Sequence, residues 1–375
     1  MACYLGMISG TSMDAIDAAL IEVPDEPAAA AASRLPFHLR AASATPFDAP
    51  LKARIAALID APERVSLDEI GQVDAALGES FARAALALLA TAGVAPAGVR
   101  ALGSHGQTLR HRPDLAPPFT WQIGDPNVIA ELTGITVVAD FRRRDVAAGG
   151  QGAPLAPVFH DQVFRSERED RVIANLGGIA NITVLARGRA VIGFDTGPAN
   201  RLLDAWIARH GPAAFDAAGV WAASGQVDTP LLDRLLEEPY LGLPPPKSTG
   251  RELFNLAWLE ARLGARRLRP EDVQATLLEY SAVTVAGAVA AQAPDAALYV
   301  CGGGAHNEAL MRALTRLRAP HPVASTAALG LDPDYVEAAA FAWFAHRTLA
   351  GAPANAPSVT GAKGLRILGG VYRHA

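Results

Sequence analysis

The stretch that decides the fold is YLGMISGTSMDAIDAALIEV, residues 4–23. Two apolar runs, residues 4–8 and 15–23, flank a short polar turn that contains glycine, a pattern that predicts two paired strands. A second copy of this arrangement, RVIANLGGIANITVLA, occupies residues 171–186. The sequence therefore predicts a β-hairpin at the start of each of two halves of the chain.

The elements expected after each hairpin come in the same order. Apolar periodicity places them at residues 36–44, 67–92, 99–103, 127–132 and 135–139 in the first half, and at 190–194, 199–210, 272–291, 297–301 and from Asn307 in the second. Each series begins with a third strand and then combines helices with strands. We therefore expect an α/β fold of two similar lobes with mixed sheets, whose glycine-rich turns face one another across a crevice.

A glycine-rich segment separates the two predicted lobes. Residues 141–157 combine an arginine run, Arg142 to Arg144, with GGQG at 149–152, and this composition predicts an irregular hinge. Residues 335–349 have the pattern of an amphipathic helix, after which the chain is expected to return to the first lobe. The expected domains are residues 1–140 plus 338–375 and residues 141–337.

Composition and charge argue against several classes of protein. The 375 residues are 50% hydrophobic and 19% charged, as in a globular chain, and a net charge of -5 offers no basic surface for nucleic acid. The two cysteines, Cys3 and Cys301, indicate neither a disulfide framework nor a metal motif. The longest apolar runs, residues 84–95 and 282–291, are shorter than the roughly 20 residues of a membrane-spanning helix. A cytoplasmic protein without membrane or nucleic-acid partners is expected, since no secretory signal is recognisable.

The first hairpin turn is suited to hold a phosphate group. Gly10 lets backbone N–H groups approach an anion, and the hydroxyls of Thr11 and Ser12 add donors. Asp14 is suited to hold a metal-bound water. The turn is no Walker loop, because the lysine of that motif is missing. An ordinary hairpin turn is the competing interpretation.

Two further glycine-rich turns lie in the second half. Asn175, Gly177 and Gly178 form a turn of the same kind as the first, and two such turns would clamp a nucleotide tail from both sides. The triglycine at residues 302–304 and Asn307 lie between a strand and a helix, where missing side chains leave room for a base or a ribose. The competing interpretation is a tight strand-to-helix connection, which would have the same glycine-rich sequence.

Candidates for acid–base and sugar contacts follow predicted strands or begin helices. Asp195 is the candidate general base, because it stands near the end of a predicted strand beside the expected crevice, although a turn or cap role would also fit. Glu337 is a second carboxylate candidate, and acids are also common in any first helical turn. His105 and Gln107 on a strand-end loop are suited to hydrogen-bond a sugar, although a lone histidine is more often structural. Arg142 is suited to meet an anion, although an arginine run is usually a solvated face. Lys247 is expected on a surface loop.

Seven blocks of this sequence together resemble the anhydro-N-acetylmuramic acid kinases. They are residues 7–14, 103–108, 175–181, 194–198, 247–252, 301–307 and 337–343. The resemblance implies two ribonuclease-H-like lobes with an interlobe cleft, the fold of the acetate kinase, sugar kinase, heat-shock ATPase and actin superfamily. It also implies that ATP and water convert 1,6-anhydro-N-acetylmuramic acid to N-acetylmuramic acid 6-phosphate in cell-wall recycling.

The resemblance assigns roles to individual residues. Asp195 becomes the base that activates water, assisted by Glu337, with ATP and Mg²⁺ as cofactors and a homodimer as the assembly. Two departures stand where glycine is expected in many members, Ala15 and Ala199, and either would disturb its loop if the position needed a positive φ. The implied ATP phosphate loop consists of Gly10, Thr11, Ser12, Met13, Asp14, Ala15, Ile16 and Asp17.

Two other functions stay open on the sequence. A kinase of the same superfamily acting on another sugar or small acid would carry the same nucleotide turns, because substrate preference varies within a fold. An actin-like or chaperone-like nucleotide switch would use them for conformational work without turnover of a small molecule. A carboxylate that is essential for transfer to a sugar favours the kinase over the switch.

Overall fold

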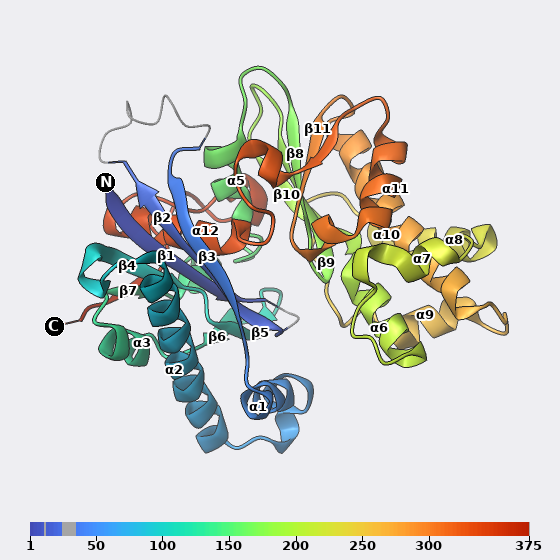
Figure 1. The fold of residues 1–375 in the computed structure, drawn as a ribbon. Coiled ribbons are helices and arrows are strands. Elements are labelled where there is room, and N and C mark those ends of the chain that lie inside the picture. The colour runs from blue at the N-terminus through green and yellow to red at the C-terminus, as the bar shows by residue number, and fades with distance from the viewer. Residues whose placement is uncertain (11–12, 25–34, 375) are drawn as a thin grey trace. The chain divides into compact units, whose positions relative to one another are not determined.

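The computed structural model describes residues 1–10, 13–24 and 35–374, and its contacts divide the chain into two compact units. Unit 1 comprises Met1–Val163 and Tyr335–Ala375, and unit 2 comprises Phe164–Asp334. The sequence predicts domain boundaries after residues 140 and 337. In the structure, the boundaries between the two units come after Val163 and Asp334. Figure 1 follows the chain through the elements of both units.

Unit 1 is built on a six-stranded sheet with the order β13-β7-β4-β1-β2-β3. The hairpin β1–β2 and strand β3 are antiparallel, β4 and β7 run parallel to β1, and β13 closes the edge antiparallel to β7. A separate hairpin is formed by β5 and β6. The strands are β1 Ala2–Ser9, β2 Ala15–Val23, β3 His38–Pro46, β4 Val99–Ser104, β5 Gln107–Arg112, β6 Phe119–Ile123, β7 Val137–Ala139 and β13 Gly370–Tyr372.

Unit 2 repeats this plan in a five-stranded sheet with the order β10-β9-β8-β11-β12. Again the first three strands are antiparallel, and the last two run parallel to the first. Its strands are β8 Arg171–Leu176, β9 Ile179–Leu185, β10 Ile192–Pro198, β11 Ala297–Cys301 and β12 Val323–Ser325. Numbered along the chain within each sheet, the first five strands of both have the order 3-2-1-4-5 of a ribonuclease-H-like lobe, and unit 1 adds β13 as a sixth strand at the edge. The predicted fold class is confirmed.

Helices pack on both sheets. Those of unit 1 are α1 Ala49–Asp60, α2 Leu67–Ala92, α3 Pro126–Thr133, α4 Phe141–Ala147, α5 Ala156–Phe164, α12 Val336–Leu349 and α13 Pro357–Thr360, and the last residue of α5 begins unit 2. Those of unit 2 are α6 Asn200–His210, α7 Val220–Ser224, α8 Thr229–Leu236, α9 Leu256–Leu263, α10 Pro270–Gln292 and α11 Glu308–Arg318.

Helix α2 begins and ends where its sequence predicts. The Ser66 hydroxyl accepts the N–H of Glu69 at 3.1 Å, which caps the first turn. The helix stops at Gly93, whose φ of 65° suits glycine. A cap at one end and a left-handed glycine at the other explain why the predicted and observed bounds, residues 67–92, agree.

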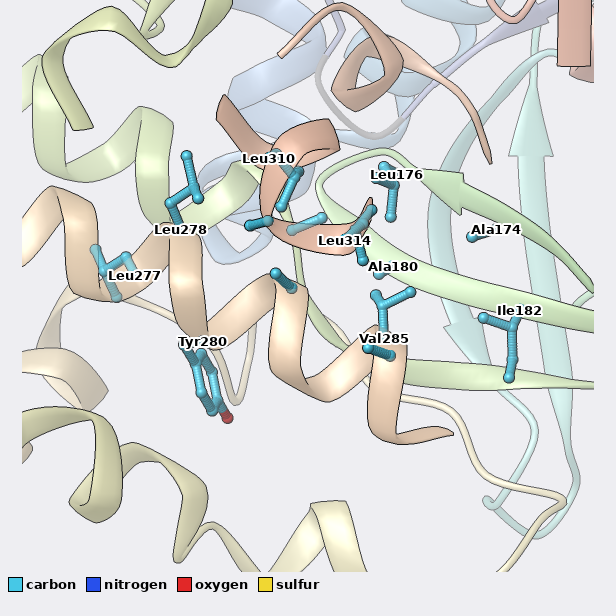
Figure 2. Packing of buried hydrophobic residues seen from close by; sticks show 14 of the residues in the cluster. Ala174, Leu176, Ala180, Ile182, Leu277, Leu278, Tyr280, Val285, Leu310 and Leu314 are labelled. Carbon is cyan, nitrogen blue, oxygen red and sulfur yellow. The ribbon is translucent and has the colours of Figure 1, made fainter. Parts of the chain in front are cut away.

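The core of unit 2 lies between its sheet and the helices α10 and α11. Figure 2 shows Ala174 and Leu176 of β8 and Ala180 and Ile182 of β9 beside Val285 of α10, with Leu310 and Leu314 of α11 close by. All seven side chains are buried. The alternate residues of these strands therefore point away from this core, and that opposite face carries the candidate site.

Helix α12 crosses the sheet of unit 1 at two glycines. A Cβ atom at Gly6 would overlap the carbonyl of Ala338 and the N–H of Ala342, and one at Gly103 would overlap the carbonyl of Phe341. The predicted helix is confirmed, but its amphipathic character is wrong. Except for Glu337, every residue from Val336 to Ala345 is buried.

The predicted irregular hinge at 141–157 is wrong over its first part, because Phe141–Ala147 forms α4. Phe141 is buried against Phe344 with ring centroids 5.7 Å apart. The buried carboxylate of Asp145 accepts the N–H of Gly152 at 2.8 Å and the hydroxyl of Thr360 at 2.9 Å. Tertiary contacts thus order a segment whose local composition indicated a loop.

Two helices of the described residues, α2 and α10, are long and apolar enough to cross a membrane by length and composition alone. The most apolar windows of α2 and α10 are 50% and 72% buried within the protein. Both helices pack on strands of their own unit, α2 on β2 and β3 and α10 on β9 and β10. This packing is that of core helices.

Candidate active site

Asp195 stands at a β-bulge near the end of β10. It pairs with Asn181 of β9, whereas the next paired residue of β10 is Gly197, opposite Ala180, so Thr196 is an extra residue in the ladder. A bulge twists its strand and redirects the side chains beside it, which is why bulges are common near active sites. The local irregularity sets the direction of the candidate base.

A segment far along the chain surrounds Asp195 with hydrogen bonds. Its Oδ2 accepts the backbone N–H of Thr249 at 2.9 Å, and its carbonyl accepts the hydroxyl of Tyr240 at 2.8 Å. Its own N–H donates to the carbonyl of Lys247 at 3.2 Å. Backbone and carboxylate are therefore both fixed by residues 240–249.

The electrostatic surroundings give Asp195 an unusual acidity. Burial of the carboxyl group raises the pKa of Asp195 to about 7, and the negative charge of Glu252 acts in the same direction. The Thr249 N–H and the Lys247 ammonium oppose this rise. Asp195 nevertheless stays partly accessible to solvent. A reachable carboxylate with a pKa near neutrality is suited to take a proton from water.

The turn between β8 and β9 is joined to the start of helix α6. The carbonyl of Gly177 accepts the N–H of Asn200 at 3.0 Å, and that of Gly178 accepts those of Ala199 and Arg201 at 3.0 and 3.1 Å. The first amides of α6 are thus already bonded within the protein. An anion at this turn would need other donors than these.

The triglycine turn packs directly on the β8–β9 hairpin. A Cβ atom at Gly302 would overlap Oδ1 of Asn175, and one at Gly304 would be 3.0 Å from the carbonyl oxygen of Leu176. At Gly303 the nearest atom, Nδ2 of Asn200, would be 3.9 Å away. The structure thus brings the two turns together in unit 2, and Gly303 leaves the open position between them.

A row of paired residues crosses the sheet of unit 2 from β10 to β11. Asp195 pairs with Asn181, Asn181 with Asn175, and Asn175 with Cys301. Residues paired across strands point to the same face, so the row links the candidate base to the triglycine turn.

Asn307 is the N-terminal cap of helix α11. Its Oδ1 accepts the N–H of Leu310 at 3.0 Å, and its side chain is buried against Gly219. Its observed contacts are those of a helix cap.

The predicted phosphate turn of unit 1 connects β1 to β2. The N–H of Met13 donates to the carbonyl of Gly10 at 3.2 Å, and Met13 has a φ of 54°. Asp14 is exposed, with Oδ1 2.9 Å from Nζ of Lys52 on α1. The predictions for Thr11 and Ser12 lie outside the described residues, and the remaining members, Ala15, Ile16 and Asp17, begin strand β2.

Neither of the two alanines that stand in place of expected glycines has a positive φ. Ala15 belongs to β2 and is absent from the described non-glycine residues with positive φ, and Ala199 has a φ of -114°. Met13, two residues before Ala15, is the left-handed position of the described part of this turn. Neither alanine therefore occupies the left-handed region that favours glycine.

The predicted sugar-binding residues of unit 1 form part of a buried network. Arg142 donates from Nε to Nε2 of His105 at 2.9 Å and from Nη1 to the carbonyl of Gly152 at 2.9 Å. Burial, and then the charge of Arg142, hold the pKa of His105 well below its usual range. His105 is therefore neutral, and Nδ1 carries the proton that it donates to the carbonyl of Gly106 at 3.0 Å.

Gln107 and Glu337 are the other two predicted site residues of this part of unit 1. Oε1 of Gln107 accepts the hydroxyl of Ser9 at 2.5 Å, which ties β5 to the end of β1. Glu337 is at the first turn of α12, and its charge counteracts the lowering by burial of the pKa of Arg142. Gln107 is buried, whereas Glu337 is partly exposed.

Two residues beside Asp195 were missed by the sequence reasoning. Lys247, expected on a surface loop, is half-buried and donates to the carbonyls of Tyr240 at 3.2 Å and Leu241 at 2.9 Å. Tyr240 carried no signal of its own. Nothing in local composition brings residues 240–249 to β10, and only the family resemblance of residues 247–252 pointed to this segment.

Comparisons with known proteins agree with the sequence resemblance. Residues 2–374 match the family model described as anhydro-N-acetylmuramic acid kinase. A protein of that name from Xanthomonas campestris pv. campestris is 54% identical over 373 residues, 98% of this chain and 97% of that protein. Another from Xylella fastidiosa is 52% identical over 370 residues, 98% of this chain and 96% of that protein.

The solved structures add only a distant likeness. The activator of the 2-hydroxyisocaproyl-CoA dehydratase from Clostridium difficile with bound ADPNP matches with a TM-score of 0.46 and 11% identity, over 90% of this chain and 91% of that chain. A score below 0.5 adds nothing to the assignment, which rests on the sequence matches. The chain belongs to the anhydro-N-acetylmuramic acid kinase family.

Proposed function

We propose that the protein is an ATP-dependent kinase that converts 1,6-anhydro-N-acetylmuramic acid to N-acetylmuramic acid 6-phosphate. The family match over residues 2–374 is the observation that carries this proposal. The partly accessible Asp195 carboxyl group with a pKa near 7 supports it, because the reaction needs a base that acts on water.

In the proposed reaction Asp195 takes a proton from water while the water oxygen bonds to the anomeric carbon. The bond from that carbon to the bridging oxygen breaks, and the released 6-oxygen accepts the γ-phosphoryl group of ATP. The products are the 6-phosphate, ADP and one proton. Because the base must be ionised, kcat/KM is expected to fall about tenfold per pH unit below pH 7.

The remaining predicted residues complete the proposal. Gly10 to Asp17 are proposed to hold the ATP phosphates together with Asn175, Gly177 and Gly178 of unit 2. The turn at 302–304 and Asn307 are proposed to hold the base or the ribose. His105, Gln107 and Arg142 are proposed to bind the sugar, and Glu337 to assist Asp195. A cleft between the two units, which the family resemblance implies, remains a prediction.

Magnesium enters the proposal through Asp14. Among the described residues no three His, Cys, Asp or Glu side chains form a metal-ligating group. Proteins commonly bind Mg²⁺ through one or two carboxylates and the phosphates of the nucleotide, so a single exposed acid at the phosphate turn fits this ion. The ion would neutralise charge on the phosphates. Lys52 pairs with Asp14 from an exposed position and would yield it to the ion.

We further propose a homodimer that acts in the cytoplasm on a small amino sugar from the cell wall. Light scattering of the purified protein measures the first point, with a mass of twice 39.0 kDa expected. A monomeric mass that persists with both substrates bound would contradict the dimer.

The reaction is tested by mass spectrometry of the product formed from the anhydro sugar and ATP in ¹⁸O-labelled water. One label at the anomeric oxygen and none in the phosphate are expected. Because the anomeric hydroxyl of a free sugar exchanges with water, unlabelled product incubated for the same time provides the control. Label in released inorganic phosphate would instead indicate hydrolysis of ATP.

A substrate panel tests the specificity. If ordinary N-acetylglucosamine or acetate were phosphorylated faster than the anhydro sugar, the protein would be a kinase of the same superfamily with another substrate. ATP turnover that no sugar stimulates would favour a nucleotide switch.

A further inference from the structure

Residues 239–250 of unit 2, here called the strap, connect helices α8 and α9 and pass beside Asp195. The strap starts with a 3₁₀ turn, Pro239–Gly242, and continues through three prolines at 244–246 to Lys247. Proline fixes the φ angle, so this run has few conformations. The strap is therefore a stiff segment rather than an adaptable loop.

The start of the strap is anchored on an aromatic cluster. The ring of Tyr240 meets that of Phe254 with centroids 6.1 Å apart, and Phe254 meets Trp258 of α9 at 5.2 Å. The buried carboxylate of Glu238, just before the strap, accepts the indole N–H of Trp258 at 2.8 Å. Edge-to-face contacts of this kind hold Tyr240 in one orientation.

Lys247 closes the strap on itself. Its ammonium group donates to the carbonyls of Tyr240 and Leu241 and lies 4.7 Å from the centroid of the Tyr240 ring. The ring of Phe194, the residue before Asp195, is 5.7 Å from the same nitrogen. These contacts direct the positive charge of the half-buried Lys247 toward two carbonyls and two aromatic rings.

The closed strap reaches Asp195 at three points. Tyr240 donates its hydroxyl to the carbonyl of Asp195, Lys247 accepts the Asp195 N–H, and the Thr249 N–H donates to the carboxylate. Tyr240 and Lys247 thus hold the backbone, and Thr249 holds the functional group. The three contacts depend on one another, because Lys247 fixes the distance between the two ends of the strap.

We propose that Lys247 is a positioning residue for the reaction, which closes the strap so that Tyr240 and Thr249 hold the Asp195 carboxylate in its working orientation. This proposal rests on the proposed role of Asp195. The chain has only three lysines among 33 basic residues, so a lysine at this point is not the default choice of the sequence. A compact ammonium fits two carbonyls and an aromatic face where a broad guanidinium would need more room.

The charges that face Asp195 make the proposal measurable. Lys247 lowers the pKa of Asp195, whereas Glu252 and burial raise it, and Tyr240 is neutral throughout because burial raises its pKa above the working range. Burial also lowers the pKa of Lys247, and the charge of Asp195 opposes this. Loss of the Lys247 charge should therefore raise the pKa of the base further.

The test is the pH profile of kcat/KM for Lys247→Met, Lys247→Arg and the control Lys363→Met, an exposed lysine of unit 1. Lys247→Met is expected to move the acid limb up by about one pH unit and to lower kcat above the limb about tenfold. Lys247→Arg should restore the acid limb to its position in the parent protein, but only part of the kcat. The control Lys363→Met should match the parent protein in both. An unmoved limb in Lys247→Met, or a rise in the KM of the sugar alone, would overturn the proposal.

Two further measurements keep the test independent of folding and of activity. Tyr240→Phe keeps the ring beneath Lys247 and removes only the hydroxyl, so kcat should fall about fivefold with an unchanged limb. Unchanged kcat in Tyr240→Phe would reject the strap as a positioning device. NMR titration of ¹³C-labelled aspartates, with Asp195 assigned from Asp195→Asn, should give a higher pKa in Lys247→Met than in the parent protein, and an equal pKa would contradict the proposal. If no sugar stimulated ATP turnover, the proposed function would fail while the titration still reported on Lys247.

Discussion

The two units share one sheet topology but differ in the elements inserted after the third strand. In unit 1, β3 is followed by the short helix α1 and then by α2. In unit 2, the corresponding stretch between β10 and α10 holds residues 199–269, which include the strap and its anchor on α9. The contacts that surround Asp195 come from this longer insertion. A common scaffold thus carries different chemistry in its two copies because the insertions differ.

The hairpin turns of the two units differ as well. The turn of unit 2 is short, and its carbonyls are bonded to the amides of α6. The turn of unit 1 is longer, contains a left-handed Met13, and ends at the exposed acid Asp14. The turn of unit 2 is thus held by hydrogen bonds to α6, whereas the turn of unit 1 presents an exposed carboxylate.

The largest expected effect tests whether unit 2 carries the base. Asp195→Asn should lower sugar-dependent kcat about 10³-fold, within the range known for loss of a general base, while ATP binding measured by calorimetry is retained. Glu337→Gln, on unit 1, should lower kcat only about tenfold. A larger loss for Glu337→Gln than for Asp195→Asn would reverse the comparison between the units.

The next effect concerns the glycine contact of unit 1. Gly103→Ala should lower the free energy of unfolding by about 3 kcal/mol, because the new methyl group overlaps the α12 backbone at Phe341. Gly71→Ala, inside α2 with open space around it, should raise that free energy by about 0.7 kcal/mol. Urea unfolding of both variants measures the difference, and equal effects would show that α12 shifts to make room.

A pH-dependent effect links stability to the acidity of Asp195. Its folded pKa of about 7 lies above the unfolded value, so its contribution is fully present below about pH 4 and is lost as pH rises through 7. Asp195→Asn should therefore raise the free energy of unfolding by about 4 kcal/mol at pH 8 and leave it unchanged below pH 4.

The matched variant for this effect is Asp170→Asn in the same unit. The N–H and guanidinium of Arg187 lower the pKa of Asp170, so this change should lower stability at neutral pH instead. Thermal unfolding at several pH values compares the two, and equal signs would contradict the acidity assigned to Asp195.

The smallest effect belongs to the turn of unit 1. Lys52→Met removes an exposed ion pair with Asp14 and should change the free energy of unfolding by less than about 0.5 kcal/mol. A larger change in urea unfolding would mean that this turn is held more rigidly than its exposure indicates.

Most of the fold could be predicted because its signals are local. Strands β2 and β11 and helix α2 have the predicted bounds, since alternation, capping and glycine stops are written in neighbouring residues. Helix α4 could not be predicted, because Phe344 and Thr360, which hold it, are about 200 positions away. The burial of α12 on all sides has the same cause, since it depends on Gly6 and Gly103.

The candidate site could be predicted only in part. Asp195 was found from its place at a strand end, but the bulge, the raised pKa and the hydrogen bond from Thr249 arise from tertiary structure. Lys247 and Tyr240 were missed because both lie in a proline-rich segment that reads as surface. Sequence patterns thus located Asp195, whereas the residues that surround it are known only from the three-dimensional structure.

The late position of α12 along the chain has a consequence for synthesis. Unit 2 lies wholly within Phe164–Asp334, whereas unit 1 needs Tyr335–Ala375 to be complete. During translation the sheet of unit 1 therefore stays incomplete until unit 2 has been synthesised. Until then α12 does not cover Gly6 of β1 and Gly103 of β4. Since domains generally fold as units while the chain is made, the second half is the first that can finish. A released chain that ends before residue 336 would hold one complete unit and one open sheet that is prone to aggregate.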